Sequence, residues 1–260
     1  ESRRKLHEAQ RFWLKSLRGK GLHDLAVSRG MKAFSNIRFR MLIVVVAGLT
    51  LLGFAANEAR KLVQAGAYNN QTEAYLDFWR EKQAKQPDEF SLLSKDYEVA
   101  LNGARRAIEL LPDAPEQWVL KARVLDWGQQ YGLMDTTDGK TPLLGAWRDA
   151  IALRPAWPYA WSDYAMAMAQ QSQINQDFEK ALLEADRLGP WEERVLENSA
   201  TLGLHYPNWL SEKTQETLNH SLQRLAERYS HKALAISRRY GQEGRLCQWL
   251  AHPERVRECQ

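Results

Sequence analysis

A short phrase that recurs along the sequence limits the architectures open to this chain. Ala107–Trp118 reads AIELLPDAPEQW, Ala150–Trp161 reads AIALRPAWPYAW, and Ala185–Leu196 carries a weaker copy, ADRLGPWEERVL. In each copy a helical pattern ends at a proline, and a large apolar residue follows six positions later. The region before the first copy is also helical in pattern, and Asn70 followed by Glu73 predicts a capped helix start. The repetition predicts an all-α domain of stacked helix pairs.

The spacing of the prolines identifies the kind of stack. Pro155 and Pro190 are 35 residues apart, close to the ~34-residue period of a tetratricopeptide repeat. Pro112 and Pro155 are 43 residues apart, and the extra length is the Gly-, Asp- and Thr-rich loop Gly132–Pro142. Small residues fall where paired helices must approach closely, at Ala100, Ala104, Ala107, Ala122 and Ala165. The chain therefore resembles a tetratricopeptide-like α-solenoid, which we expect to occupy residues 61–260.

Two kinds of position can be separated on the repeated helices. Trp118 and Trp161 are equivalent in the repeat, which places them at the packed joint between consecutive helices, and burial of one such ring is worth a few kcal/mol. Tyr159 lies on a different stripe, which in tetratricopeptide proteins faces the concave groove where partner peptides lie. A solvated helix surface is the alternative for each residue of the stripe. The expected partner-binding groove comprises Glu116, Arg123, Asp126, Tyr159, Met166, Arg194 and Glu197, and Trp157 has no assigned role.

An uncharged apolar run, Met41–Ala56, points to a membrane. Its sixteen residues would rise roughly 24 Å as a helix, slightly less than a ~30 Å hydrocarbon layer. Neighbouring apolar residues lengthen the run if Arg38 and Arg40 extend their guanidinium groups to the lipid headgroups. We therefore expect one transmembrane helix within residues 37–60. A buried core helix and a cleaved signal peptide are the alternatives, although the basic segment before the run is far longer than in a signal peptide.

The charges on the two sides of the run predict its orientation. Of 36 Lys and Arg and 32 Asp and Glu, residues 1–40 hold 11 and 3, which leaves 25 basic and 29 acidic residues in the remainder. Basic residues beside a span stay in the cytoplasm, so we expect a bacterial inner-membrane protein with residues 1–36 cytoplasmic and 61–260 periplasmic. Cys247 and Cys259 would then lie on the oxidising side, close enough in sequence for a disulfide, with two free thiols as the alternative.

The basic segment 1–36 has apolar residues near helical spacing, Trp13 among them. This pattern predicts amphipathic helices that lie on anionic lipid, with Trp13, Arg38 and Arg40 at the membrane interface. A clamp on the cytoplasmic side of another membrane protein is the second interpretation. We expect no nucleic-acid partner, because no recognition motif is present.

Motifs for catalysis or cofactor binding are missing from the sequence. Asp138–Thr141 reads DGKT, but a phosphate-binding loop needs glycine where Met134 stands. The six histidines have no metal-ligand spacing. Glu192 and Glu193 are adjacent, so they point apart on a helix and make a poor acid–base pair. We expect a protein that is not an enzyme and has neither cofactor nor metal.

Four phrases in the second half resemble the VpsP family. They are RPAWPYAW at Arg154–Trp161, FEKALLEADRLGPWE at Phe178–Glu192, ALAISRRYG at Ala233–Gly241 and GRLC at Gly244–Cys247. The resemblance covers roughly residues 100–250 and implies a membrane-anchored, tetratricopeptide-like accessory protein of bacterial exopolysaccharide biosynthesis. It implies a role in polymerisation or export of the polysaccharide rather than an established enzymatic activity.

Two function classes follow from these observations. The first is an adaptor that holds a polytopic inner-membrane protein of polysaccharide assembly, while its helical domain receives a periplasmic partner or the polysaccharide. Direct binding of the polysaccharide by Trp157 and Tyr159 is a separate, third possibility. The second is a periplasmic chaperone-like accessory factor of the protein translocon. A groove that mixes charged and aromatic residues favours the adaptor, because a promiscuous chaperone groove is expected to be hydrophobic.

Overall fold

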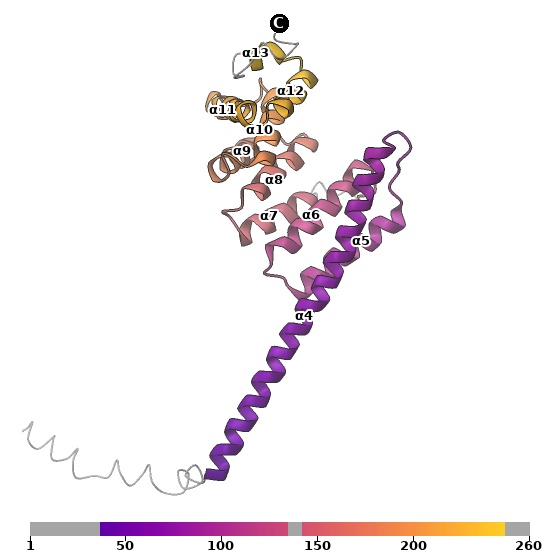
Figure 1. The fold of residues 1–260 in the computed structure, drawn as a ribbon, viewed down its shortest axis with the longest axis vertical. Helices are drawn as coiled ribbons and strands as arrows, with labels where there is room; N and C mark the ends of the chain where they lie inside the picture. Colours follow the sequence, from indigo (N-terminus) through magenta and orange to yellow (C-terminus); the bar gives the residue numbers. More distant parts are fainter. Residues whose placement is uncertain (1–36, 135–141, 248–260) are drawn as a thin grey trace, which may run out of the picture. The chain divides into compact units, whose positions relative to one another are not determined.

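The computed structural model describes residues 37–134 and 142–247 of the 260-residue chain, and all regular secondary structure in these ranges is helical. Helices α5 to α13 follow one another along the second part of the chain (Figure 1). The helices are α4 (Ile37–Lys85), α5 (Ser94–Leu110), α6 (Pro115–Gln130), α7 (Pro142–Leu153), α8 (Pro158–Gln170), α9 (Gln176–Leu188), α10 (Glu193–His205), α11 (Glu212–Arg228), α12 (Ser230–Arg239) and α13 (Glu243–Cys247). The predicted all-α fold class is confirmed.

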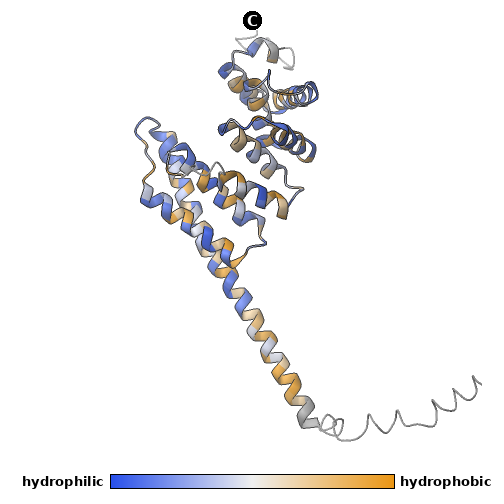
Figure 2. Ribbon diagram, turned by 180° about the vertical axis from the view of Figure 1, so that it is seen from behind, coloured by the Kyte–Doolittle hydropathy of each residue, from blue (hydrophilic) through white to orange (hydrophobic). Residues whose placement is uncertain are grey.

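The chain divides into two compact units, Glu1–Arg60 and Lys61–Gln260. The described part of the first unit is the N-terminal portion of α4, which Figure 2 shows as a hydrophobic stretch. From Met41 onward α4 contains a segment long and apolar enough to cross a membrane. The large apolar side chains there, such as Leu51 and Phe54, are exposed, so the described segment is not a core helix of this chain.

The expected helix start at Asn70 is wrong, because α4 continues from Ile37 to Lys85 without a break. An N-cap residue must have a non-helical backbone, and Asn70 lies in the helix interior. The residues around it explain the continuation. Ala65, Leu76 and Trp79 all lie on the buried side of this part of α4, so one unbroken helix is what presents them to the core.

The second unit consists of helix pairs. α6 packs along α7, α8 along α9, and α10 along α11, and successive pairs then pack together through α8 with α10 and α10 with α12. The C-terminal part of α4 contacts α5, where the Thr72 hydroxyl donates a hydrogen bond to the Ala100 carbonyl at 3.3 Å. This order of pairs is the helix arrangement that the repeated phrase predicts.

The repeated prolines and tryptophans form the same joint twice. The indole Nε1 of Trp118 donates to the carbonyl of Pro112 at 2.9 Å, and that of Trp161 donates to the carbonyl of Pro155 at 2.8 Å. Each tryptophan thereby satisfies a carbonyl beyond the end of the preceding helix. In the third copy, Leu196 is fully buried. The predicted position at the helix joints is confirmed, but Trp118 and Trp161 are only partly buried there, so the expected full burial of the rings is wrong.

Small residues make the close approach of the helices possible. All five alanines named from the sequence, Ala100, Ala104, Ala107, Ala122 and Ala165, are fully buried. Larger side chains fill the remaining space: Trp79 lies 5.7 Å from Trp127 between ring centroids, and Trp127 stacks on Tyr131 at 5.8 Å. Buried aromatic pairs of this kind add about 0.5–1.5 kcal/mol beyond the area that they bury. The core therefore fixes the spacing of the helices that carry the candidate site.

Candidate functional site

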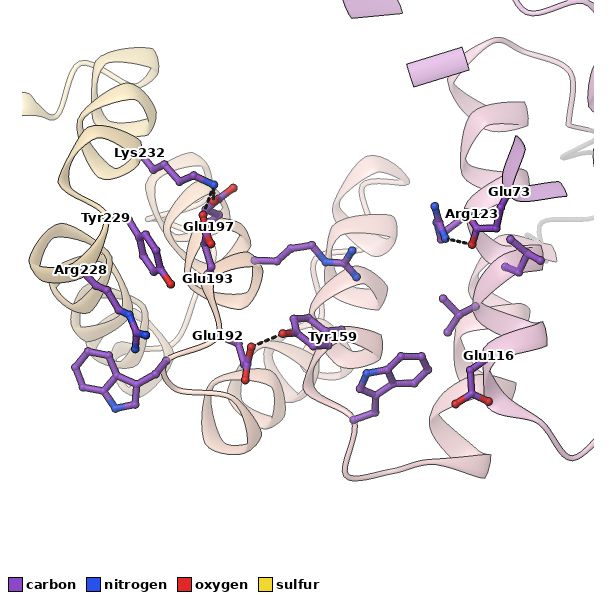
Figure 3. Close-up of a pocket in the computed structure, with 15 residues that line it drawn as sticks. Glu73, Glu116, Arg123, Tyr159, Glu192, Glu193, Glu197, Arg228, Tyr229 and Lys232 are labelled. Atoms are coloured by element: carbon purple, nitrogen blue, oxygen red, sulfur yellow. Dashed lines mark hydrogen bonds and ion pairs between the residues drawn. The ribbon is translucent and has the colours of Figure 1, made fainter. Parts of the chain in front are cut away.

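A groove of about 950 Å³ lies in the second unit, on the side to which α4, α6, α8, α10 and α12 contribute (Figure 3). These are the first helices of the successive pairs, so equivalent faces of the repeat line one surface. The residues that line this groove are Glu73, Glu116, Val119, Leu120, Arg123, Trp157, Tyr159, Trp191, Glu192, Glu193, Arg194, Glu197, Arg228, Tyr229 and Lys232.

A smaller hollow of about 380 Å³, the side pocket, shares Arg123 and Arg194 with the groove. Its other lining residues are Arg80, Asp126, Trp127, Trp147, Asp163, Met166, Ala167, Gln170 and Asn198. The two hollows adjoin, so an extended ligand in the groove can reach the side pocket with one side chain.

All seven residues predicted for the partner-binding groove line one or both of these hollows. Glu116, Tyr159 and Glu197 line the groove, and Asp126 and Met166 line the side pocket. The remaining two, Arg123 and Arg194, line both hollows. Spacings of three, four and seven residues on each helix bring these side chains to one face. That they bind a partner stays a prediction.

Ion pairs connect neighbouring helices along the groove. Arg123 of α6 pairs with Glu73 of α4 at 2.6 Å, and Arg194 of α10 pairs with Asp163 of α8. Lys232 of α12 pairs with two glutamates of α10, Glu193 and Glu197 (Figure 3). Partly exposed pairs contribute only about 0–1 kcal/mol each to stability. Their main effect is to hold long side chains in defined positions on the groove wall.

Four aromatic rings line the groove, and each has an arginine over its face. The guanidinium carbon lies 4.8 Å from the ring centroid for Arg154 on Trp157 and 5.2 Å for Arg194 on Tyr159. Two wider pairs follow, Arg228 on Tyr229 at 5.7 Å and Arg224 on Trp191 at 6.0 Å. Cation–π contacts at partly exposed sites are worth about 0.5–1 kcal/mol. Each ring is thus held in place on one side and leaves other surface for a ligand.

Several groove residues that lie on turns were not in the predicted partner-binding groove, although Trp157 had been considered as a contact for polysaccharide. Trp157 is the N-cap residue of α8 and Glu192 is the N-cap residue of α10, and both stand two positions after a repeat proline. Trp191 precedes Glu192 on the same turn. The signal that could have found them is this fixed offset, because a residue at the same place in each turn faces the same side of the stack.

Burial and hydrogen bonding change the acid–base properties of the site. Burial raises the pKa of Asp163 to about 6, although Arg194 and Asn198 act in the opposite direction. Burial also raises the pKa of Asp126, against hydrogen bonds from Gln170 and Gln130. The Tyr159 hydroxyl donates to Glu192, which raises the tyrosine pKa, as Figure 3 shows for the pair. Burial thus disfavours the charged form of both aspartates, and only Asp163 has an arginine partner, Arg194.

The remaining predicted sites lie mostly beyond what the structure describes. Trp13 and Cys259 are outside the described residues. Arg38 and Arg40 lie in α4, but their side chains are not described. Cys247 is disulfide-bonded. Among the described residues, no cluster of three or more His, Cys, Asp or Glu side chains is arranged to hold a metal ion.

The helix pairs, the buried alanines and the groove define the class of the domain: it is an all-α, tetratricopeptide-like helical repeat. No protein-family model matches the chain, and no curated protein matches it. Among solved structures, PilF of Pseudomonas aeruginosa is similar at 18% identity and a TM-score of 0.37, covering 74% of this chain and 87% of its own. The MamA protein is similar at 14% identity and a TM-score of 0.25, covering 66% and 94%.

Because both TM-scores lie below 0.5, the fold class rests on this chain's own helix pairs and not on the superpositions.

Proposed function

We propose that this protein is a non-catalytic, membrane-anchored adaptor whose groove binds an extended segment of a partner protein. The observation that carries the proposal is the groove itself, where aromatic rings held by arginines alternate with ion pairs that link successive helices. Such a surface offers stacking, hydrogen bonds and charge at fixed positions. These are the elements of specific recognition, whereas a groove for many unrelated clients would be mainly apolar.

The partner that we propose is a polytopic inner-membrane protein of exopolysaccharide polymerisation or export. Support comes from the VpsP-like phrases, of which Phe178–Glu192 and Ala233–Gly241 are the two longest. The proposed topology has residues 1–36 in the cytoplasm on anionic lipid and the helical repeat in the periplasm. An anchored groove raises the effective concentration of its partner at the membrane, which is how a scaffold without catalytic groups promotes assembly.

The test compares two exposed tryptophans. Trp191 lines the groove and is 49% exposed, whereas Trp209 is 71% exposed and lines neither hollow. The tagged wild-type chain, Trp191→Ala and Trp209→Ala are extracted in mild detergent from native membranes, and co-purifying proteins are identified by mass spectrometry. We expect the wild type and Trp209→Ala to recover a stoichiometric polysaccharide polymerase, ligase or co-polymerase, and Trp191→Ala to recover at least about tenfold less, as at a binding hot spot.

Three results would count against the proposal. Equal recovery by the two variants would remove the groove from the interaction. Recovery of translocon subunits together with assorted secretory clients would favour a chaperone-like factor. Binding of oligosaccharide by the purified chain, lost in Tyr159→Ala, would make the polysaccharide the ligand in place of a protein segment.

A further inference from the structure

The side pocket contains a carboxylate whose charge the protein does not balance. Three arginines line this pocket, and each already has an acidic partner: Arg80 pairs with Asp77 at 2.7 Å, Arg123 with Glu73, and Arg194 with Asp163. Asp126 has no ion pair among the described residues. Its carboxylate is hydrogen-bonded by the neutral amides of Gln130, at 3.0 Å, and Gln170. When the ion-pair partners outside the pocket are counted, three guanidinium groups stand against four carboxylates, and Asp126 is the carboxylate without a cationic partner.

The position of Asp126 makes this imbalance unfavourable in the empty protein. A partly buried carboxylate loses hydration, and two amide donors replace only part of what water supplied. The charge of Asp163 in the same pocket adds repulsion, which makes a smaller contribution than burial to the raised pKa of Asp163. A cation beside Asp126 would offset both the lost hydration and this repulsion.

The rest of the pocket wall suits the stem of a basic side chain. Trp127 and Trp147 are almost completely buried and present ring surface, and Met166 and Ala167 add aliphatic surface. Lysine and arginine side chains carry three or four methylene groups behind the charge, which pack well against such walls while the charged end meets carboxylates. These apolar walls offer no ligands to a sodium or magnesium ion, because such ions bind oxygen atoms.

We propose that the side pocket binds a lysine or arginine side chain of the partner, with Asp126 as the residue that receives its charge. This inference rests on the proposed function, because the groove holds the segment from which that side chain enters. It adds a specificity rule to the groove: the bound segment carries a basic residue at one fixed position. Charge-assisted hydrogen bonds of this kind are worth roughly tenfold to a hundredfold in affinity.

The experiment selects linear nine-residue peptides from a random displayed library on the full chain in lipid nanodiscs. The protein is tested as wild type, as Asp126→Asn, and as Asp149→Asn, a control at an exposed aspartate of α7 that lines neither hollow. The wild type and Asp149→Asn should select peptides with Lys or Arg at one fixed position. The Asp126→Asn protein should lose that preference, since asparagine keeps the shape of the side chain and removes its charge.

A second measurement changes the peptide and leaves the protein intact. Replacing the basic residue of a selected peptide by norleucine should weaken binding to the wild type by at least about tenfold and should change binding to Asp126→Asn by less than about threefold. Helical content by circular dichroism checks that the variant is folded. Because the peptide substitution is read on the wild-type protein, the outcome does not depend on that variant.

The outcomes separate the two proposals. Selected peptides that lose binding in Trp191→Ala, yet show no basic position, overturn the inference about Asp126 and leave the groove as the binding site. A wild-type chain that selects no peptide at all overturns the proposed function and this inference with it.

Discussion

Gly128→Ala tests the close packing of α5 against α6. Gly128 faces Tyr97, and a Cβ atom added to it would lie 2.5 Å from three atoms of that side chain, Cε2, Cζ and the phenolic oxygen. Tyr97 is itself buried, so its ring has little room to move. Glycine to alanine inside a helix normally stabilises by about 1 kcal/mol, whereas overpacking a core costs about 1–3 kcal/mol. The difference is a net destabilisation of about 0–2 kcal/mol, where helix propensity alone would stabilise.

The matched control is Gly66→Ala in α4, where an added Cβ meets no atom within 4 Å. This change should stabilise by up to about 1 kcal/mol, because only helix propensity acts there. Urea unfolding of the full chain in non-ionic detergent, followed by far-UV circular dichroism, measures both changes. Tyr97→Leu makes room for the new methyl group, so Gly128→Ala should reduce the free energy of unfolding only slightly in the Tyr97→Leu background. A double-mutant cycle then gives the coupling free energy between positions 97 and 128. If Gly128→Ala stabilised the wild type as much as Gly66→Ala does, the close approach of α5 to α6 at Tyr97 would be refuted.

Three further changes test single contacts by the same unfolding assay. Trp161→Phe removes the indole bond to the Pro155 carbonyl and should cost about 0.5–1.5 kcal/mol; no change would mean that the repeated joint adds nothing to stability. The Asn175 side chain caps α9 by accepting hydrogen bonds from the backbone amides of Asp177 and Phe178. Asn175→Ala should therefore lower the free energy of unfolding by about 1 kcal/mol, and an unchanged urea midpoint would show that this cap does not stabilise the helix. The pKa of Asp163 is about 6 in the folded protein against an ordinary 3.8, so the folded state binds the proton of this carboxyl more tightly than the unfolded state does. The free energy of unfolding of the wild type, relative to that of Asp163→Asn, should therefore rise by up to about 3 kcal/mol as the pH falls from 7 to 4. A difference that does not change with pH would refute the raised pKa.

The stacking of the helices could be predicted from the sequence because it follows from local repetition. The six-residue interval from proline to tryptophan sets the joint at Trp118 and again at Trp161, and the buried alanines mark the crossings. The failure at Asn70 has a physical cause as well. A capping pattern is a weak local signal, and burial of Leu76 and Trp79 on the same helix outweighs it.

The groove was predictable in part, since stripe spacing identifies which residues of one helix share a face. It does not identify partners on other helices. Arg123 and Arg194 were expected to contact a ligand directly, yet each is already paired with a carboxylate of a neighbouring helix. Asp126, predicted on the same stripe as Arg123, is left without such a partner. Whether a groove residue has an ion-pair partner depends on contacts between residues at least 31 positions apart in the sequence. The residue pattern of a single helix carries no information about such contacts.

The central claim is that the partner binds in the groove, and photo-crosslinking in native membranes tests it most directly. A benzoylphenylalanine at position 159, which replaces Tyr159 in the groove, is compared with one at position 209, which replaces the exposed Trp209 outside it. The account predicts one discrete crosslinked membrane protein from position 159 and none from position 209. Crosslinks from position 209 alone, or from neither position, would contradict it.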